Sequence, residues 1–127
     1  MTEDRRYTNL EKFKFEKLII WQKAMDFGES INNITLAFPD KEKYNLSSQI
    51  CRASDSIALN ISEGSIGQSN LEQKKIIGYS IRSLAEVVTC LFKAKRRNYL
   101  TETIFFELYD EAFHLINMMN AFKKNIK

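Results

Sequence analysis

The stretch that decides the fold is SQICRASDSIALNISEG, residues 48–64. Its apolar residues recur every three or four positions, at Ile50, Ala53, Ile57 and Ile61, which is the spacing of one face of an α-helix. A second, polar stripe with the same period lies about 100° further round the helix. It comprises Gln49, Arg52, Ser56, Asn60 and Glu63. Because buried polar groups need hydrogen-bonding partners, the stretch predicts a helix whose polar stripe lies at the edge of a core.

Two helices are expected in the first half of the chain. The first should cover residues 16–36, because apolar residues keep helical spacing along it and Pro39 cannot continue it. The second should cover residues 46–63, and Gly64 stands where a glycine commonly caps a helix C-terminus. The short connection between them favours an antiparallel pair.

Two more helices are expected in the second half. Ser69 and Glu72 have the spacing of a capping box, which predicts the start of a helix that ends near Arg97. Thr101 is a suitable N-terminal cap for a last helix that continues almost to the C-terminus. No segment alternates apolar and polar residues with period two, so we expect no strand. The four segments predict an all-α, antiparallel up-down-up-down four-helix bundle.

The composition fits one bundle domain over residues 13–127, preceded by a charged, mobile arm over residues 1–12. The chain has 127 residues, of which 44% are hydrophobic and 28% charged, and these values argue against a disordered protein. Its longest aliphatic and aromatic run, residues 18–21, is far too short to span a membrane. Cys51 and Cys90 match no short metal or redox motif, so we expect reduced thiols and a cytoplasmic protein.

Several separated segments carry a resemblance to a known family. Residues 48–64 resemble its signature S-Q-I-x-R-A-x-x-S-I-x-x-N-I-x-E-G, and residues 15–24 (FEKLIIWQKA) resemble its opening helix. Residues 38–46 resemble its first connection, and residues 83–86 (SLAE) resemble part of its third helix. Over roughly residues 13–122, the chain thus resembles the four-helix bundle proteins of the 23S rRNA-intervening sequence protein family, encoded within bacterial rRNA genes.

This resemblance implies a bundle that assembles into pentameric rings, in a family whose biochemical role is poorly defined. A relative, the accessory variability protein of diversity-generating retroelements, assists a reverse transcriptase and has a basic surface. Two positions depart from the family pattern. Cys51 replaces one residue of a basic pair, and Arg82 stands where relatives often have glycine, which argues against a close helix approach there.

The sequence lacks the motifs of common enzymes and cofactor sites. It contains neither a phosphate-binding G-x-x-x-x-G-K nor a dinucleotide fingerprint. An E-x-x-H motif ends at His114, but this is the only histidine, and a di-iron bundle needs that motif twice. Cys51 or Cys90 could serve as a nucleophile with His114, but a cysteine among apolar helix residues is usually a core residue. We therefore expect no catalytic residue, metal, cofactor or small-molecule substrate.

The polar stripe of residues 48–64 permits two interpretations. Arg52, Asn60 and Glu63 could together bind a small polar ligand. Alternatively, Asn60 and Glu63 could satisfy backbone groups of the following loop, while Arg52 pairs with Glu86 on a facing helix. We favour the structural interpretation, because removing one buried partner leaves the other unpaired. The predicted structural set is Gln49, Arg52, Asn60, Glu63 and Gly64.

Basic residues are concentrated toward the two ends of the expected bundle. One end should collect Lys12, Lys14, Lys17, Lys74, Lys75, Lys123, Lys124 and Lys127. The other should collect Lys41, Lys43, Lys93, Lys95, Arg96 and Arg97. Cations near helix C-termini complement the helix dipole, but this does not explain the lysines at or before helix N-termini.

The first of these ends is the predicted nucleic-acid-binding face. The net charge is only +3, so affinity for RNA or DNA would depend on segregation of charge rather than on total charge. We expect weak binding with slight base selectivity, because lysines contact phosphates and no base-reading helix is evident. The aromatic residues lie mostly at core spacing, and no stacking platform is evident.

Further apolar residues lie at helical angles outside the core seams. The predicted interface set is Trp21, Phe105, Phe106, Tyr109 and Phe113. Large exposed apolar patches usually mark an interface, so we expect a closed homo-oligomer that uses the first and last helices. An alternative function is a purely structural oligomer that scaffolds a protein partner.

Overall fold

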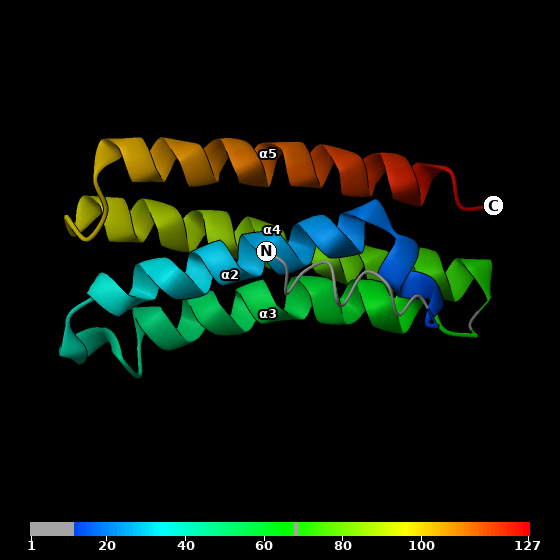
Figure 1. The fold of residues 1–127 in the computed structure, drawn as a ribbon, viewed down its shortest axis with the longest axis horizontal. Helices are drawn as coiled ribbons and strands as arrows, with labels where there is room; N and C mark the ends of the chain where they lie inside the picture. Colours follow the sequence, from blue (N-terminus) through cyan, green and yellow to red (C-terminus); the bar gives the residue numbers. More distant parts are fainter. Residues whose placement is uncertain (1–11, 68) are drawn as a thin grey trace.

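The computed structural model describes residues 12–67 and 69–127, and within them every regular element is a helix (Figure 1). The long helices are α2 (Ile19–Ile34), α3 (Leu46–Gly64), α4 (Asn70–Arg96) and α5 (Glu102–Lys124). The short 3₁₀ helices are η1 (Lys14–Lys17), η2 (Thr35–Ala37) and η3 (Asp40–Glu42). The prediction of an all-α four-helix bundle is confirmed. Apart from Lys12, the predicted arm lies outside the described residues.

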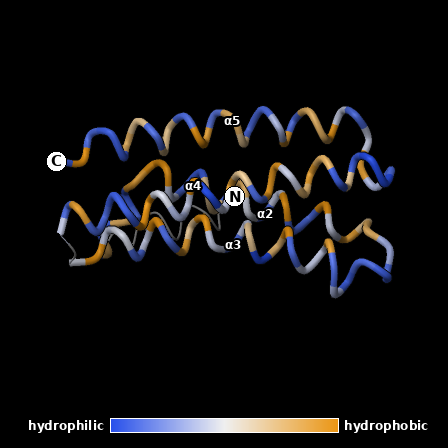
Figure 2. The backbone as a smooth tube through the Cα atoms, turned by 180° about the vertical axis from the view of Figure 1, so that it is seen from behind, coloured by the Kyte–Doolittle hydropathy of each residue, from blue (hydrophilic) through white to orange (hydrophobic). Residues whose placement is uncertain are grey.

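Successive long helices run in opposite directions, so the bundle has up-down-up-down order (Figure 1). Hydrophobic positions recur between hydrophilic ones along each helix (Figure 2), and the hydrophobic ones form a single core. α3 packs most extensively against α4. The completely buried large side chains are Phe27, Ile31, Leu46, Ile50, Ile57, Ile61, Ile77, Leu84, Val87, Leu91 and Met119.

The first predicted helix is interrupted near its start. η1 ends at Lys17, Leu18 has an extended backbone (φ −77°, ψ 122°), and α2 begins at Ile19. The bend brings the Phe15 ring to 5.1 Å from the Trp21 ring, measured between centroids. Residues six apart do not share a face of a straight helix, so this contact requires the break. The Gln22 side chain donates to the Glu16 carbonyl at 2.8 Å and stabilises the bend.

The prediction that Gly64 caps the second helix is wrong. Gly64 is the last helical residue, and Ser65 follows it with a right-handed backbone (φ −90°, ψ −6°). Gly64 is buried, and a Cβ at this position would lie 3.4 Å from Cγ2 of Ile76 on α4. Among the described residues of the loop that follows α3, Gly67 has a left-handed backbone (φ 58°). The absence of a side chain at Gly64 thus allows α3 to pack closely against α4.

The predicted caps of the last two helices are confirmed. The Ser69 hydroxyl accepts from the Glu72 backbone N–H at 3.1 Å, and the Thr101 hydroxyl accepts from the Ile104 N–H at 3.1 Å. Each cap satisfies one of the backbone donors that a helix N-terminus leaves free. No helix in the described part of the chain combines the length and hydropathy that a membrane crossing requires.

Candidate nucleic-acid interface

Three segments that are far apart in the sequence meet at one end of the bundle. η1, the first turns of α4 and the last turn of α5 all lie there, together with the C-terminus (Figure 1). We call this the lysine end. It carries Lys12, Lys14, Lys17, Lys74, Lys75, Lys123, Lys124 and Lys127. The convergence follows from the antiparallel order of the helices, as the sequence predicts.

Most lysines of this end are exposed, whereas Lys74 and Lys123 are half-buried. The Lys123 ammonium crosses to α4, where its Nζ lies 3.5 Å from the position that a Cβ at Gly78 would occupy. None of the eight lysines forms an ion pair with a residue in 12–67 or 69–127. Among the described residues, therefore, no carboxylate neutralises their charge.

The lysine end also carries an ordered row of aromatic rings. The Phe13 and Phe15 rings are 5.6 Å apart between centroids, with an interplanar angle of 22°, and Phe15 in turn packs on Trp21. Phe13 is 59% exposed, and Trp21 is half-buried. The sequence did not predict this partly exposed row of rings. The alternation of lysine and phenylalanine over residues 12–15 was the available signal.

The opposite end is organised around a buried carboxylate, and we call it the Glu42 end. Glu42 is 3% exposed. One carboxylate oxygen accepts from Tyr99 at 2.7 Å and from Arg97 at 3.0 Å. The other accepts from the Asn45 side chain at 3.1 Å and from the Leu46 backbone N–H at 3.2 Å. The carboxylate thus ties the α2–α3 connection to the α4–α5 connection.

The titration behaviour of this cluster follows from its hydrogen bonds. The Tyr99 hydroxyl, the Leu46 N–H and the nearby Arg97 hold the pKa of Glu42 below its ordinary value, against the opposing effect of burial. The same bond to Glu42 raises the pKa of the Tyr99 hydroxyl. Sequence reasoning missed this cluster because Glu42 and Tyr99 are far apart in the chain.

The polar stripe of α3 forms hydrogen bonds within its own helix and to α4. The Asn60 amide donates to the Ser56 carbonyl at 2.8 Å, and the Ser56 hydroxyl bonds the Ala53 carbonyl and the Ser83 hydroxyl. Gln49 and Asn60 are half-buried, as expected. Glu63 is exposed, so the stripe lies at the edge of the core along only part of its length.

The predicted ion pair between Arg52 and Glu86 does not form, although both residues lie in the described part of the chain. Arg52 is exposed, and its guanidinium donates instead to the Ser48 hydroxyl, one turn earlier on α3, at 3.2 Å. A solvated guanidinium needs no facing carboxylate, and Glu86 is likewise exposed.

Arg82 does not hold α3 and α4 apart. It is exposed, with its guanidinium 6.0 Å from the centroid of the Tyr79 ring. On the other side of α4, the buried Ser80 hydroxyl donates to the Ile57 carbonyl of α3 at 2.8 Å. The two helices therefore approach closely on the side of α4 that faces away from Arg82, and the exposed Arg82 side chain does not prevent this contact.

The E-x-x-H segment has no metal-site geometry. His114 is exposed, and its Nδ1 lies 2.8 Å from the Asp110 carbonyl oxygen. Glu111 is half-buried, and burial together with the Asp26 carboxylate raises its pKa. Within the described ranges, no three His, Cys, Asp or Glu side chains are grouped to hold a metal. Cys90 is buried, and this burial raises the pKa of its thiol.

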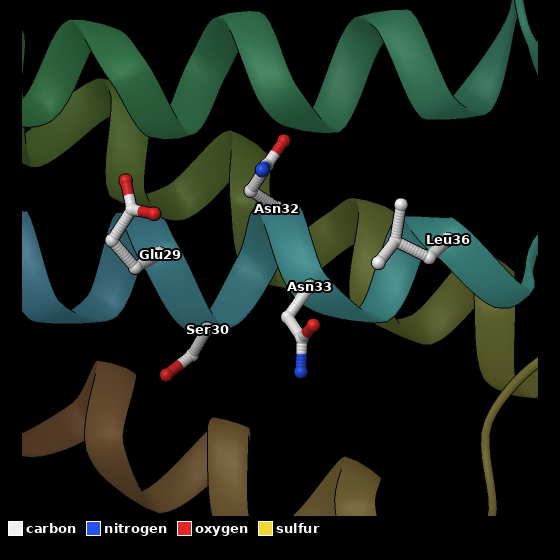
Figure 3. A pocket seen from close by; sticks show the side chains of 5 residues that line it. All are labelled: Glu29, Ser30, Asn32, Asn33 and Leu36. Atoms are coloured by element: carbon white, nitrogen blue, oxygen red, sulfur yellow. The ribbon is translucent and has the colours of Figure 1, made fainter.

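A shallow depression runs over the exposed side of α2 near the Glu42 end (Figure 3). Glu29 and Asn32 point toward α3, whereas Ser30 and Asn33 point toward α5. Leu36 lies beyond them and is 81% exposed. Because these side chains diverge instead of converging on one point, the depression offers no preformed small-molecule site.

The predicted interface residues are divided between surface and core. Phe106, Tyr109 and Phe113 are exposed by 52%, 38% and 57%. Phe105 is only 2% exposed and packs within the chain against Phe92, so its place in the predicted interface is wrong. One helical position separates Phe105 from Phe106, and that rotation of about 100° takes one ring into the core and the other to the surface.

Comparison with known proteins supports the fold. The family model of the 23S rRNA-intervening sequence proteins matches residues 16–121. The chain is similar to a crystal structure of a protein with unknown function from the S23 ribosomal protein family of Bacteroides thetaiotaomicron. That similarity has a TM-score of 0.77 at 20% identity and covers 84% of this chain and 100% of the other. Neither description indicates an enzyme, and no curated protein matches the chain. Because the family model covers most of its length, the chain belongs to the 23S rRNA-intervening sequence protein family.

Proposed function

We propose that this protein is a non-enzymatic, oligomeric binding protein that contacts nucleic acid, RNA in particular, weakly and without base preference through the lysine end. The observation that carries the proposal is the convergence of lysines from η1, α4 and α5 on one end of the bundle. Their lack of ion-pair partners within residues 12–67 and 69–127 leaves this charge available for phosphates.

Electrostatics explains why such binding would be weak and tolerant of sequence. Lysines that neutralise phosphates release counterions, so the logarithm of affinity falls with the logarithm of salt by about 0.9 per phosphate on a B-form duplex. A lysine ammonium recognises a phosphate as a point charge and carries no information about the base. The net charge of +3 is small, so binding depends on the segregation of charge at this end.

A titration of labelled RNA and duplex DNA from low to physiological salt tests the proposal. We expect affinity to fall steeply with salt, and the double variant Lys74→Glu with Lys75→Glu to lose binding. The matched control is Lys41→Glu with Lys43→Glu, which reverses two exposed charges at the Glu42 end and should retain binding. Absence of binding at low salt, or equal loss in both double variants, contradicts the proposal. Thermal melting verifies that each variant is folded.

A second surface supports self-association. Tyr109 on α5 lies 6.1 Å from Phe92 on α4, measured between ring centroids, and Phe92 is 47% exposed. Phe106 and Phe113 lie about one turn before and after Tyr109 on α5, so these exposed rings share the outer side of the bundle. Exposed apolar surface of this kind is typical of an interface. We propose a closed homo-oligomer through this face, with a ring of five as the expected form.

Light scattering tests this assembly. A ring of five would have five times the subunit mass of 14.9 kDa, and Phe106→Ser with Phe113→Ser should shift the mass toward that of one subunit. A wild-type mass of one subunit at micromolar concentration contradicts self-association. A protein that assembles but shows no salt-dependent binding of nucleic acid would instead favour a scaffold for a protein partner.

A further inference from the structure

Phe13 presents an exposed aromatic ring that packs on other rings of the chain. Its ring stacks on Phe15 at a centroid distance of 5.6 Å, and Phe15 packs on the half-buried Trp21 at 5.1 Å. The Phe13 backbone is fixed as well, because its N–H donates to the Glu16 carboxylate at 3.1 Å while its carbonyl accepts from the Glu16 N–H at 3.1 Å. With 59% of the residue exposed, the row of rings ends in an open aromatic surface.

The charges around this ring match a phosphate backbone. Lys12 and Lys14 flank Phe13 in sequence, Lys17 lies one turn further on, and all three are exposed. Single-stranded nucleic acids are typically bound by a basic surface that follows the backbone and by aromatic rings on which unpaired bases stack. Both components are present at the lysine end.

We propose that Phe13 is a stacking site for an unpaired base of single-stranded nucleic acid. The inference rests on the proposed nucleic-acid binding of the lysine end and adds a preference for unpaired strands. A base that stacks on Phe13 would extend the Phe13–Phe15 row by one ring, while neighbouring lysines contact the phosphates on either side. Bases within a duplex are already stacked on each other, so a duplex would use the lysines alone.

The alternative occupant of a basic, partly apolar surface is an anionic membrane. Interfacial binding requires several apolar side chains that lie side by side and enter the lipid together. The sequence neighbours of Phe13 are instead the exposed Lys12 and Lys14, and one face of its ring is covered by Phe15. These features favour a flat, single partner such as a base.

The test compares Phe13→Leu with wild-type protein in binding to labelled single-stranded RNA and to a duplex of the same length. Leucine keeps apolar bulk but removes the aromatic surface. We expect affinity for the single strand to fall about tenfold and affinity for the duplex to stay unchanged. Phe13→Trp should retain the wild-type preference. The matched control is Leu71→Ala, which shortens an exposed aliphatic side chain near the start of α4 and should change neither affinity.

Each of the following results overturns the stacking site. The first is unchanged binding of single-stranded RNA by Phe13→Leu. If the Lys74→Glu, Lys75→Glu variant still loses binding in that case, the proposed function stands and only the stacking site fails. The second is an equal loss for single strand and duplex, which assigns Phe13 a structural role. The third is that Phe13→Leu loses binding to phosphatidylserine vesicles but not to RNA. If the wild-type protein binds no nucleic acid, both the proposed function and the stacking site are wrong.

Discussion

Both ends of this bundle are basic, but their cations are used differently. At the Glu42 end, Arg97 and Tyr99 meet one buried carboxylate, and Lys95 lies 3.9 Å from Glu102. At the lysine end, eight lysines have no ion-pair partner among residues 12–67 and 69–127. Lys41, Lys43, Lys93 and Arg96 at the Glu42 end likewise have no ion-pair partner in the described part of the chain. The difference between the ends therefore lies in Arg97 and Lys95, whose charges help to close the fold, whereas no lysine of the lysine end does so among the described residues.

The largest expected effect comes from Glu42→Ala. This change removes the acceptor for Tyr99, Arg97, Asn45 and the Leu46 N–H, and it leaves the buried Leu46 N–H and the half-buried Tyr99 hydroxyl without this partner. We expect the greatest loss of unfolding free energy among the variants considered below, measured by urea denaturation. Glu102→Ala breaks only the exposed pair with Lys95 and should have little effect. If Glu42→Ala and Glu102→Ala had equal unfolding free energies, the buried Glu42 carboxylate would not be what stabilises this end.

A smaller loss is expected from Gly64→Leu at the lysine end. The buried glycine permits α3 and α4 to approach, and a Cβ there would already lie 3.4 Å from Ile76. A larger side chain forces the helices apart, at a cost of about 1–3 kcal/mol in unfolding free energy. The neighbouring Glu63→Leu is the control, because Glu63 is exposed. Wild-type stability in Gly64→Leu would show that close packing does not hold this end together.

Acid should weaken the Glu42 end selectively. The pKa of Glu42 in the folded protein is below its ordinary value of 4.5, so its stabilising contribution is complete above that pH. The contribution is lost as the pH falls through the folded-state pKa. Urea denaturation at about pH 3 and pH 7 should therefore show a smaller acid-induced loss in Glu42→Ala than in the wild type. An identical loss in both proteins would assign acid sensitivity to other carboxylates.

The smallest effect is expected from Lys75→Gln. Lys75 is exposed and has no ion-pair partner in the described part of the chain, so unfolding free energy should change by no more than about 0.5 kcal/mol. Because the lysine end is expected to act on phosphates, the same variant should reduce the salt dependence of RNA binding. A stability loss of about 1 kcal/mol or more would reveal a structural role for this lysine.

Local sequence patterns predicted most of the fold. Helical spacing in residues 48–64 placed α3 correctly, and Ser69 and Thr101 marked the starts of α4 and α5. Convergence of the lysines was also predictable, because antiparallel order alone determines which helix ends meet. The break at Leu18 was not predictable, since helical spacing continues through this residue and does not reveal the Phe15–Trp21 contact that accompanies the break.

The partners of polar side chains were harder to predict than the helices. Glu42 binds Arg97 and Tyr99 across the bundle, and nothing in the spacing of the sequence links these residues. Arg52 was expected to pair with Glu86, yet both residues are exposed to solvent and form no ion pair with each other. Similarly, the helical spacing of apolar residues does not show that Phe105 lies in the core while the adjacent Phe106 lies at the surface.

The close contact between α3 and α4 has a consequence for the order of folding. These helices are consecutive in the chain, so their contacts close only a short loop and cost little chain entropy. Their Ser80–Ile57 bond and the glycine contact at Gly64 also need neither α2 nor α5. We expect the α3–α4 hairpin to form first and α2 and α5 to dock onto it. Backbone amides of α3 and α4 would then exchange with deuterium last, and earlier protection of α5 would contradict this order.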